Sequence, residues 1–401
     1  MFRKLLFWSH LIAGLATGIV VFMMSLTGVI LTYERQWRAA VAEGRYLPAE
    51  QQGVPLPLEQ LLSKAGELQA GQPYTTLVIT NHPGAPVEFR SGRRAGATLN
   101  PYSGDPLPVR SEPLERFLSA VTGWHRWFNV GGEGRAAARQ ITGVSNAVFL
   151  FLILSGLYLW LPPLVQSATL RARLWFRSDY PSSKSRDFHW HHIFGIWAAL
   201  PLLAVVYTGM VISYPWAATA LYRVFGAELP VAESAAPVAG GAPGATATTL
   251  LPPRDPAAAV LGSPIHTVAG PQPPLALASL VERAVAHAQG DWQRLQITLP
   301  APADSLVRIE IDRGNGAQAH KRYTLGLERS SGAVVDVRTS ADTPATQRLR
   351  GIARYLHTGE VLGFFGQTVA GLVSLAALFM VWTGFALSWR RLIQPLLGRR
   401  R

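Results

Sequence analysis

Four stretches of the chain are long and apolar enough to cross a lipid bilayer. They cover residues 11–32, 141–161, 193–221 and 361–389, and none of them contains Asp, Glu, Lys or Arg. About 20 helical residues span a hydrocarbon core of roughly 30 Å. The sequence therefore predicts a membrane α-helical protein with four transmembrane helices. The first stretch is too long for a signal peptide and no small-residue cleavage site follows it, so we expect this helix to be retained.

Basic residues gather beside these stretches in the short segments of the chain. They are Arg3, Lys4, Arg171, Arg173, Arg177, Lys184, Arg186, Arg390, Arg391 and residues 399–401. Short loops rich in Lys and Arg stay in the cytoplasm, so we expect both termini and the loop between the second and third helices on that side. This orientation explains the basic clusters better than a nucleic-acid partner does, although the net charge is +13.

An internal duplication relates the two halves of the chain. His10, Gly14 and the dipeptide Thr27-Gly28 recur 181 residues later as His191, Gly195 and Thr208-Gly209. The dipeptide Ser155-Gly156 likewise recurs 228 residues later as Thr383-Gly384. Repeats at a constant offset indicate a repeated architecture. The chain is therefore predicted to contain two pseudo-symmetric halves, each built as helix, outside segment, helix. A Pro/Ala/Gly-rich stretch at 229–274 lengthens the second half and is expected to form a flexible loop.

The duplication divides the chain into eight segments. Transmembrane helices are placed at 1–33, 139–161, 190–221 and 359–390, a cytoplasmic loop at 162–189 and a basic tail at 391–401. The two outside segments, 34–138 and 222–358, each begin with a helical pattern, at 57–68 and 275–289. Short runs of alternating apolar residues follow, which is typical of a half-buried sheet. The sequence therefore predicts two small α+β domains outside the membrane.

Histidine is the main candidate for cofactor binding, because the chain has no Cys and ten His. His10 and His191 occupy equivalent positions of the repeat and so lie at one membrane depth. A histidine there is costly unless it faces the bundle interior and finds a partner. Two facing imidazoles could ligate one haem iron from both sides. Gly14 and Gly195 lie one turn further along and could admit a flat macrocycle, although ordinary helix packing explains each glycine equally well.

His125 and His357 form a second candidate pair at the outer ends of helices two and four. Their neighbours Arg126 and Arg354 could pair with haem propionates. At the inner site His192 is the alternative ligand to His191, since adjacent helical residues point about 100° apart and cannot share a face. We prefer His191 because it keeps the four-residue spacing to Gly195. His82, His266, His287 and His320 lie in the outside segments without metal-ligand spacing.

These motifs together resemble the PepSY-associated transmembrane family. They include the His-x-x-x-Gly entries of helices one and three, the segment Trp124-His125-Arg126-Trp127 and the turn from Asn100 to Gly104. The resemblance spans nearly the whole chain. It implies PepSY-like periplasmic domains on a bacterial inner-membrane protein and two haem b groups, with their iron held by His10, His125, His191 and His357.

The same resemblance implies a function. Members of the family include dihaem proteins that reduce ferric siderophores in the periplasm during iron uptake. We therefore expect a dihaem b-type cytochrome that passes electrons outward to a ferric siderophore or another ferric chelate and releases Fe(II). The chain has no Gly-x-Gly-x-x-Gly segment for a nicotinamide or flavin cofactor, so its electron donor is expected to be a separate cytoplasmic or membrane molecule.

Two other functions are compatible with the same sequence. One is a general transmembrane electron carrier, such as a quinol-linked cytochrome, that serves a different periplasmic acceptor. The other is a non-redox sensory or regulatory protein, in which the outside domains bind a partner. A purified sensory protein would be colourless, whereas both redox functions require a b-type spectrum.

Overall fold

The computed structural model describes the chain except residues 45, 49–50, 70–72, 93, 108–111, 162–172, 228–272, 317 and 399–401. The predicted flexible loop at 229–274 and the basic residues 399–401 therefore fall largely or wholly outside the described residues. Part of the expected cytoplasmic loop, including Arg171, lies outside them as well.

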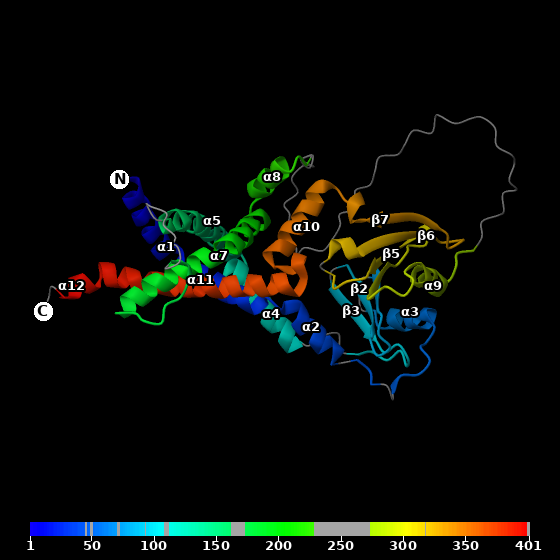
Figure 1. The fold of residues 1–401 in the computed structure, drawn as a ribbon. Helices are drawn as coiled ribbons and strands as arrows, with labels where there is room; N and C mark the ends of the chain where they lie inside the picture. Colours follow the sequence, from blue (N-terminus) through cyan, green and yellow to red (C-terminus); the bar gives the residue numbers. More distant parts are fainter. Residues whose placement is uncertain are drawn as a thin grey trace, which may run out of the picture.

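Four of the described helices are long and apolar enough to span a membrane. They are α1 (Phe2–Leu31), α5 (Gly134–Trp160), α7 (Ser183–Ser213) and α11 (Gly363–Leu392). In the bundle, α1 contacts α5 and α11, and α7 contacts the same two helices. Figure 1 shows the bundle on the left, with both chain termini at its far end. We call that end the terminal end and the opposite one the sheet end.

The third spanning helix is shorter than the sequence predicted. We expected one helix over 193–221, but α7 ends at Ser213 and α8 (Pro215–Val224) begins in a new direction. Tyr214 between them has an extended backbone, with φ −124° and ψ 126°. A residue that precedes proline is disfavoured in the helical conformation, so the break follows from Pro215.

Shorter helices surround the sheet end of the bundle. They are α2 (Glu34–Glu43), α4 (Glu112–Trp127), α8, α10 (Ala345–His357) and the 3₁₀ turn η4 (Glu360–Leu362), while α12 (Gln394–Gly398) follows α11 at the terminal end. Of these, α4 packs against α1 and α5, and α10 packs against α7. Our sequence analysis did not predict α4 or α10 as separate helices, although they carry His125 and His357.

The described strands form one antiparallel sheet of seven, in the order β3-β2-β1-β4-β5-β6-β7. Their bounds are β1 (Thr76–Thr80), β2 (Val87–Ser91), β3 (Arg94–Leu99), β4 (Arg294–Thr298), β5 (Leu306–Asp312), β6 (Arg322–Glu328) and β7 (Val334–Thr339). The 3₁₀ turns η2 (Ala319–Lys321) and η3 (Ser340–Asp342) precede β6 and follow β7.

One hydrophobic core serves the whole sheet. Alternate residues of the strands, such as Leu77, Phe89, Ile297 and Ile309, are almost fully buried under α3 (Leu58–Glu67) and α9 (Leu277–His287). Because successive side chains of a strand point to opposite faces, the polar residues between them lie on the other face. Burial of the apolar face against the two helices is what stabilises the sheet.

The two outside units that we predicted are joined in the structure. β1 from the first half pairs with β4 from the second over five residues, including Leu77 opposite Ile297. Each half contributes one helix and a set of strands, but they share a continuous sheet and one core. The expectation of two separate domains is therefore corrected to one sheet built from both halves. Edge-to-edge pairing covers a strand edge that each half would otherwise expose.

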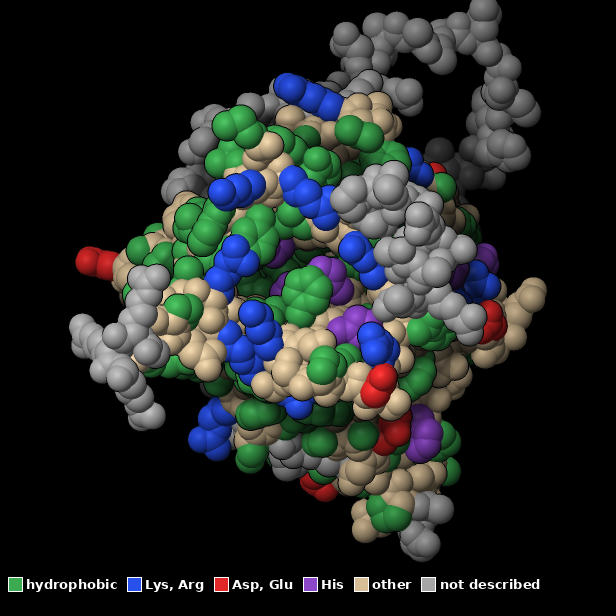
Figure 2. Space-filling model, turned by 60° about the vertical axis from the view of Figure 1, so that its left-hand side comes forward, with side chains coloured by type: hydrophobic (Ala, Val, Ile, Leu, Met, Phe, Trp, Pro, Cys, Tyr) green, Lys and Arg blue, Asp and Glu red, His purple; other side chains and the backbone are tan. Residues whose placement is uncertain are grey.

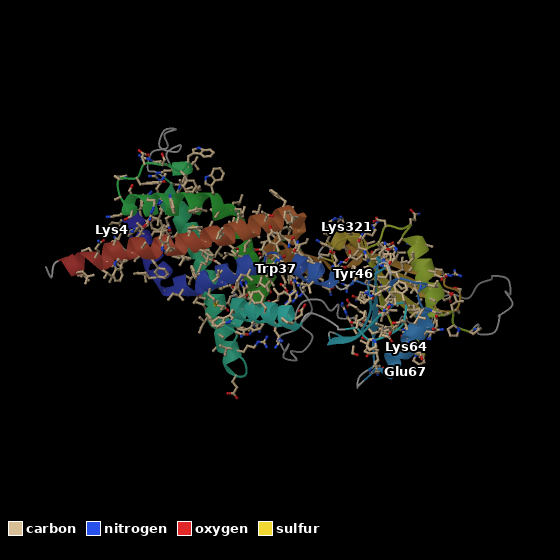
Figure 3. All side chains as sticks on the ribbon, turned by 90° about the horizontal axis from the view of Figure 1, so that it is seen from below. Lys4, Trp37, Tyr46, Lys64, Glu67 and Lys321 are labelled. Carbon is tan, nitrogen blue, oxygen red and sulfur yellow. The ribbon has the colours of Figure 1, made fainter. Side chains whose placement is uncertain are left out.

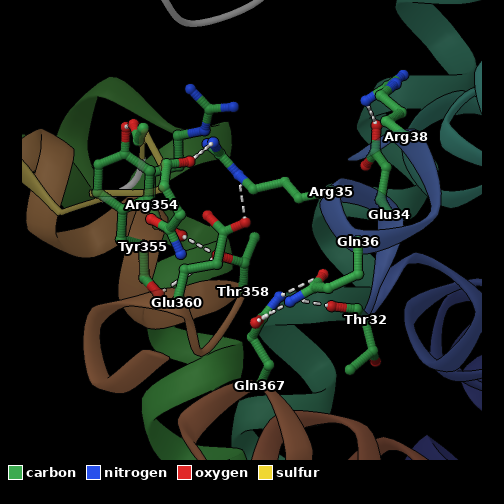
Figure 4. A network of polar contacts seen from close by, with 12 residues as sticks. Thr32, Glu34, Arg35, Gln36, Arg38, Arg354, Tyr355, Thr358, Glu360 and Gln367 are labelled. Carbon is green, nitrogen blue, oxygen red and sulfur yellow. Dashed lines mark hydrogen bonds and ion pairs between the residues drawn. The ribbon is translucent and has the colours of Figure 1, made fainter. Parts of the chain in front are cut away.

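A polar network ties this sheet to the bundle (Figure 4). Arg35 of α2 forms an ion pair with Glu360 at 2.5 Å and donates to the carbonyl of Asn315, which lies between β5 and β6. Tyr355 of α10 donates to the carbonyl of Gly316 in the same loop. Deeper in the network, the Gln367 side chain donates to the carbonyl of Thr32. The network joins α2, α10 and α11 to one loop of the sheet.

Candidate functional site

His10 and His191 face each other near the terminal end of the bundle. His10 lies on α1 and His191 on α7, and their ring centroids are 6.5 Å apart. The Nδ1 atom of His10 is 2.8 Å from the Ser155 hydroxyl on α5. The Nδ1 atom of His191 is 3.0 Å from the Thr383 hydroxyl on α11. All four spanning helices therefore contribute to this pair, as the offsets of the internal repeat allow.

His125 and His357 face each other at the sheet end. Their ring centroids are 6.2 Å apart, although α4 and α10 come from different halves of the chain. His125 Nδ1 is 2.9 Å from the Thr27 hydroxyl on α1. His357 Nδ1 is 2.8 Å from the carbonyl oxygen of Val205 on α7. The one-turn shift between His357 and the strict repeat equivalent of His125 thus still brings the two rings together.

The hydrogen bonds of the four rings give them one tautomer. Ser155, Thr383 and Thr27 each donate their hydroxyl hydrogen to a carbonyl four residues earlier in their own helix, at 2.7 Å. A hydroxyl has only one hydrogen to donate, so each oxygen accepts from the histidine Nδ1–H. The carbonyl of Val205 can only accept. All four imidazoles therefore carry hydrogen on Nδ1 and keep the lone pair of Nε2 free for a ligand.

Glycines leave room for each ring. A Cβ atom added to Gly156 would lie 3.4 Å from Cε1 of His10, and one added to Gly384 would lie 3.7 Å from Cε1 of His191. At the sheet end, the corresponding distances are 3.7 Å from Gly28 to His125 and 3.1 Å from Gly209 to His357. A larger side chain at any of these positions would meet an imidazole.

The Ser/Thr-Gly dipeptides are therefore part of the site, which our sequence analysis missed. It used them only to mark the repeat. Their signal was available, because each dipeptide lies on a spanning helix and recurs at the same offset as the histidines or the opposite helices. In three of the four, the hydroxyl meets a histidine; the exception is Thr208, which bonds within its own helix to Ala204.

The remaining candidates of the inner site lie beside the pair. The ring of His192 packs on Phe188 at 4.2 Å, and its Nδ1 contacts the carbonyl of that residue. His191 is thus the ring that meets His10. Gly14 and Gly195 make no close approach to a histidine, since an added Cβ would first meet Leu152 at 3.9 Å and Met380 at 3.7 Å.

Positive charge surrounds the pair at the sheet end. Burial lowers the pKa of the Arg126 guanidinium, and the nearby guanidinium groups of Arg139, Arg135 and Arg354 lower it further. Arg126 also lies over the ring of Trp127, at 5.0 Å from its centroid. Arg126 and Arg354 are therefore close enough to interact, and the cluster favours an anionic group beside His125.

The terminal end is basic as well. Figure 2 shows Lys and Arg side chains around a hollow in which His side chains are visible. One acidic residue is buried nearby. Asp187 has no exposed surface and forms ion pairs with Arg390 at 2.5 Å and Arg186 at 3.0 Å. The pair with Arg390 joins α7 to α11 one helical turn before His191.

A family model matches nearly the entire chain. The model of the PepSY-associated TM region covers residues 7–391. The chain belongs to this family. The four spanning helices and both histidine pairs lie within the matched residues, so the family region includes the bundle and the sheet inserted in it. No curated protein matches the chain. The family thus supports a membrane protein, while ligand and activity must be argued from the site.

Proposed function

We propose that this protein is a dihaem b-type cytochrome of a bacterial inner membrane. In this proposal it passes electrons from a donor on the cytoplasmic side to a ferric siderophore or similar ferric chelate in the periplasm. The observation that carries the proposal is the pair of facing histidines at each end of the bundle. Each pair has its Nδ1 atoms held by hydrogen bonds and its Nε2 atoms free.

The spacing of the rings fits a haem held by two axial imidazoles. An iron–nitrogen bond of about 2.0 Å on each side, with about 1.1 Å from nitrogen to ring centre, places two such centroids about 6.2 Å apart. The observed separations are 6.5 and 6.2 Å. The described residues contain no group of three or more His, Cys, Asp or Glu that could hold a bare metal ion, so two-ligand sites of this kind suit a macrocycle that supplies the other four nitrogens.

The side chains of the protein would hold and orient the cofactor. His10 and His191 would ligate one iron, and His125 and His357 the other, which leaves no open position for oxygen chemistry. The hydroxyls of Ser155, Thr383 and Thr27 would raise the basicity of their histidines. Arg126 would pair with propionate charge at the sheet end. When bound, each haem supplies a reversible one-electron iron couple, which is the only redox chemistry that the proposal requires.

The direction of electron flow is supported by the charge distribution. Arg3, Arg186 and Arg390 lie at the terminal end, which the positive-inside rule places in the cytoplasm. The sheet then lies in the periplasm. A ferric ion that gains one electron there becomes Fe(II), which oxygen-rich chelators hold more weakly, and the iron is released without acid–base catalysis.

A vesicle assay tests this proposal. Purified protein is reconstituted into liposomes with dithionite sealed inside and ferric citrate outside, and Fe(II) is detected with an external chelator. We expect external Fe(II) to form with the intact chain and to be reduced at least about tenfold in His125→Ala. Equal Fe(II) formation by liposomes without protein, or by His125→Ala, would contradict transmembrane reduction through this site.

The hydroxyl of Thr383 provides a finer test of the same proposal. Thr383→Val keeps the shape of the side chain but removes the acceptor for His191 Nδ1–H. We expect haem retention at this site to fall about tenfold, in line with the loss of a hydrogen bond to a metal-bound histidine. Thr17→Val is the matched control, because Thr17 donates only to the carbonyl of Ala13 in its own helix. Titration of the apoprotein with haem measures both, and equal retention by the two variants would exclude the proposed role of Thr383.

A lipid-facing groove favours one second candidate, the general quinol-linked carrier. The groove has a volume of about 520 Å³ and is lined by Ala13, Gln140, Phe151, Tyr214, Trp216 and neighbouring apolar residues. It begins one helical turn from His10, and its polar groups lie among apolar walls, which suits a quinol head. If a short-chain quinol reduces the protein within seconds and ferric citrate does not reoxidise it, this second candidate replaces the ferric-chelate proposal.

A further inference from the structure

A polar cavity opens at the edge of the sheet that faces the bundle. It has a volume of about 470 Å³, within the range of small-molecule sites. Its lining combines two arginines with imidazole, phenol and hydroxyl groups, namely Arg313, Arg322, His287, His320, Tyr323 and Thr339. None of these residues belongs to the histidine pairs described above.

The arginines give the cavity its chemistry. Arg313 lies over the ring of Tyr323 at 5.3 Å and makes one long contact with Asp291, at 3.5 Å. Arg322 contacts Glu310 at 3.6 Å, and its Nε atom is buried without a hydrogen-bond partner among the described residues. A buried donor without a partner is costly. Both guanidinium groups therefore keep donors for a ligand, and carboxylate oxygens match their geometry best.

One loop connects this cavity to the histidine pair at the sheet end. The loop between β5 and β6 provides Arg313 and His320 to the cavity. Between those two residues, Asn315 and Gly316 accept hydrogen bonds from Arg35 and Tyr355. Tyr355 precedes His357 by only two residues. In Figure 3, Lys321 of this loop lies on the side of the sheet toward the bundle, whereas Lys64 and Glu67 lie beyond it.

We propose that this cavity binds an anionic, carboxylate-bearing ferric chelate, with Arg313 and Arg322 as its principal contacts. The inference rests on the proposed function, since it names where that reaction would hold its substrate. The bound ferric ion would gain one electron, supplied through the His125–His357 site by the cytoplasmic-side donor, and leave as Fe(II). No bond to the protein forms or breaks. His287 and His320 act here as hydrogen-bond donors at the rim, a role their sequence positions did not indicate.

Binding of gallium(III) citrate to the full-length holoprotein in detergent tests the site without redox chemistry. Gallium(III) has the size and charge of iron(III) but does not accept an electron under these conditions. By calorimetry we expect the wild type to bind it, and Arg313→Gln combined with Arg322→Gln to weaken binding at least about tenfold. Arg308→Gln is the matched control, because Arg308 is an exposed arginine of β5 outside the cavity, and it should bind as the wild type does.

Three results would overturn the site: no binding by the wild type, wild-type binding by the double variant, or an equal loss in Arg308→Gln. The test also separates the site from the proposed function. A chain that binds gallium citrate but carries no haem keeps the site and loses the function, whereas a haem-loaded chain that does not bind it loses only the site. With ferric citrate and both haems present, the double variant should raise KM and leave kcat within about twofold.

Discussion

His10→Ala is expected to reduce the haem content of the purified protein from two per chain to one. The variant removes one of two axial nitrogens and leaves His191 facing an empty position across 6.5 Å. A single imidazole with its Nδ1 still bound to Thr383 cannot replace the lost iron–nitrogen bond. We expect the haem between His125 and His357 to remain, because Thr27 and Val205 hold that pair independently. A pyridine haemochrome assay per mole of protein measures the change.

His192→Ala is the control for this experiment. His192 is adjacent to the proposed ligand, but its ring packs on Phe188 and its Nδ1 contacts a carbonyl of the same helix. The variant should therefore keep both haems, while His191→Ala should lose one as His10→Ala does. If His192→Ala loses a haem and His191→Ala does not, the ligand of the inner site is His192 and the assignment of His191 is wrong.

Asp187→Ala is expected to destabilise the bundle by about 3 kcal/mol, a typical result when one partner of a buried ion pair is removed. Asp187 is fully buried between Arg390 and Arg186. Without it, two guanidinium groups would remain side by side at the junction of α7 and α11. The same junction holds His191 against Thr383, so loss of the ion pair should also weaken retention of the inner haem.

Unfolding in detergent, followed by circular dichroism, measures this effect. Asp179→Ala serves as the control, because Asp179 forms a solvent-exposed ion pair with Arg177 and surface pairs contribute little. The control should unfold at the wild-type midpoint. An Asp187→Ala variant that does so as well would show that the buried pair contributes nothing measurable to the bundle.

Much of the bundle could be predicted from the sequence, because apolar length and the constant repeat offset report directly on membrane helices. The same offset placed His10 and His191 at one depth. The second pair was harder to predict. His125 and His357 lie on α4 and α10, which are amphipathic and polar on average, so apolar length gives no signal for them.

Tertiary contacts account for the other features that the sequence did not reveal. Pairing of β1 with β4 joins strands more than two hundred residues apart, and alternation within each strand cannot identify its neighbour. The contacts of Ser155 and Thr383 with histidines depend on the facing of helices from both halves. A serine or threonine inside a helix commonly bonds only to its own backbone, as Thr17 does, so spacing alone does not distinguish the two cases.

The most direct test of the account is the reduced-minus-oxidised absorption spectrum of the purified full-length protein. We predict a b-type α-band with an intensity that corresponds to two haems per chain, since four imidazoles in two facing pairs keep their Nε2 atoms free. Protein that is folded and colourless, even after haem is added to the apoprotein, would contradict the dihaem assignment and favour a non-redox sensory role.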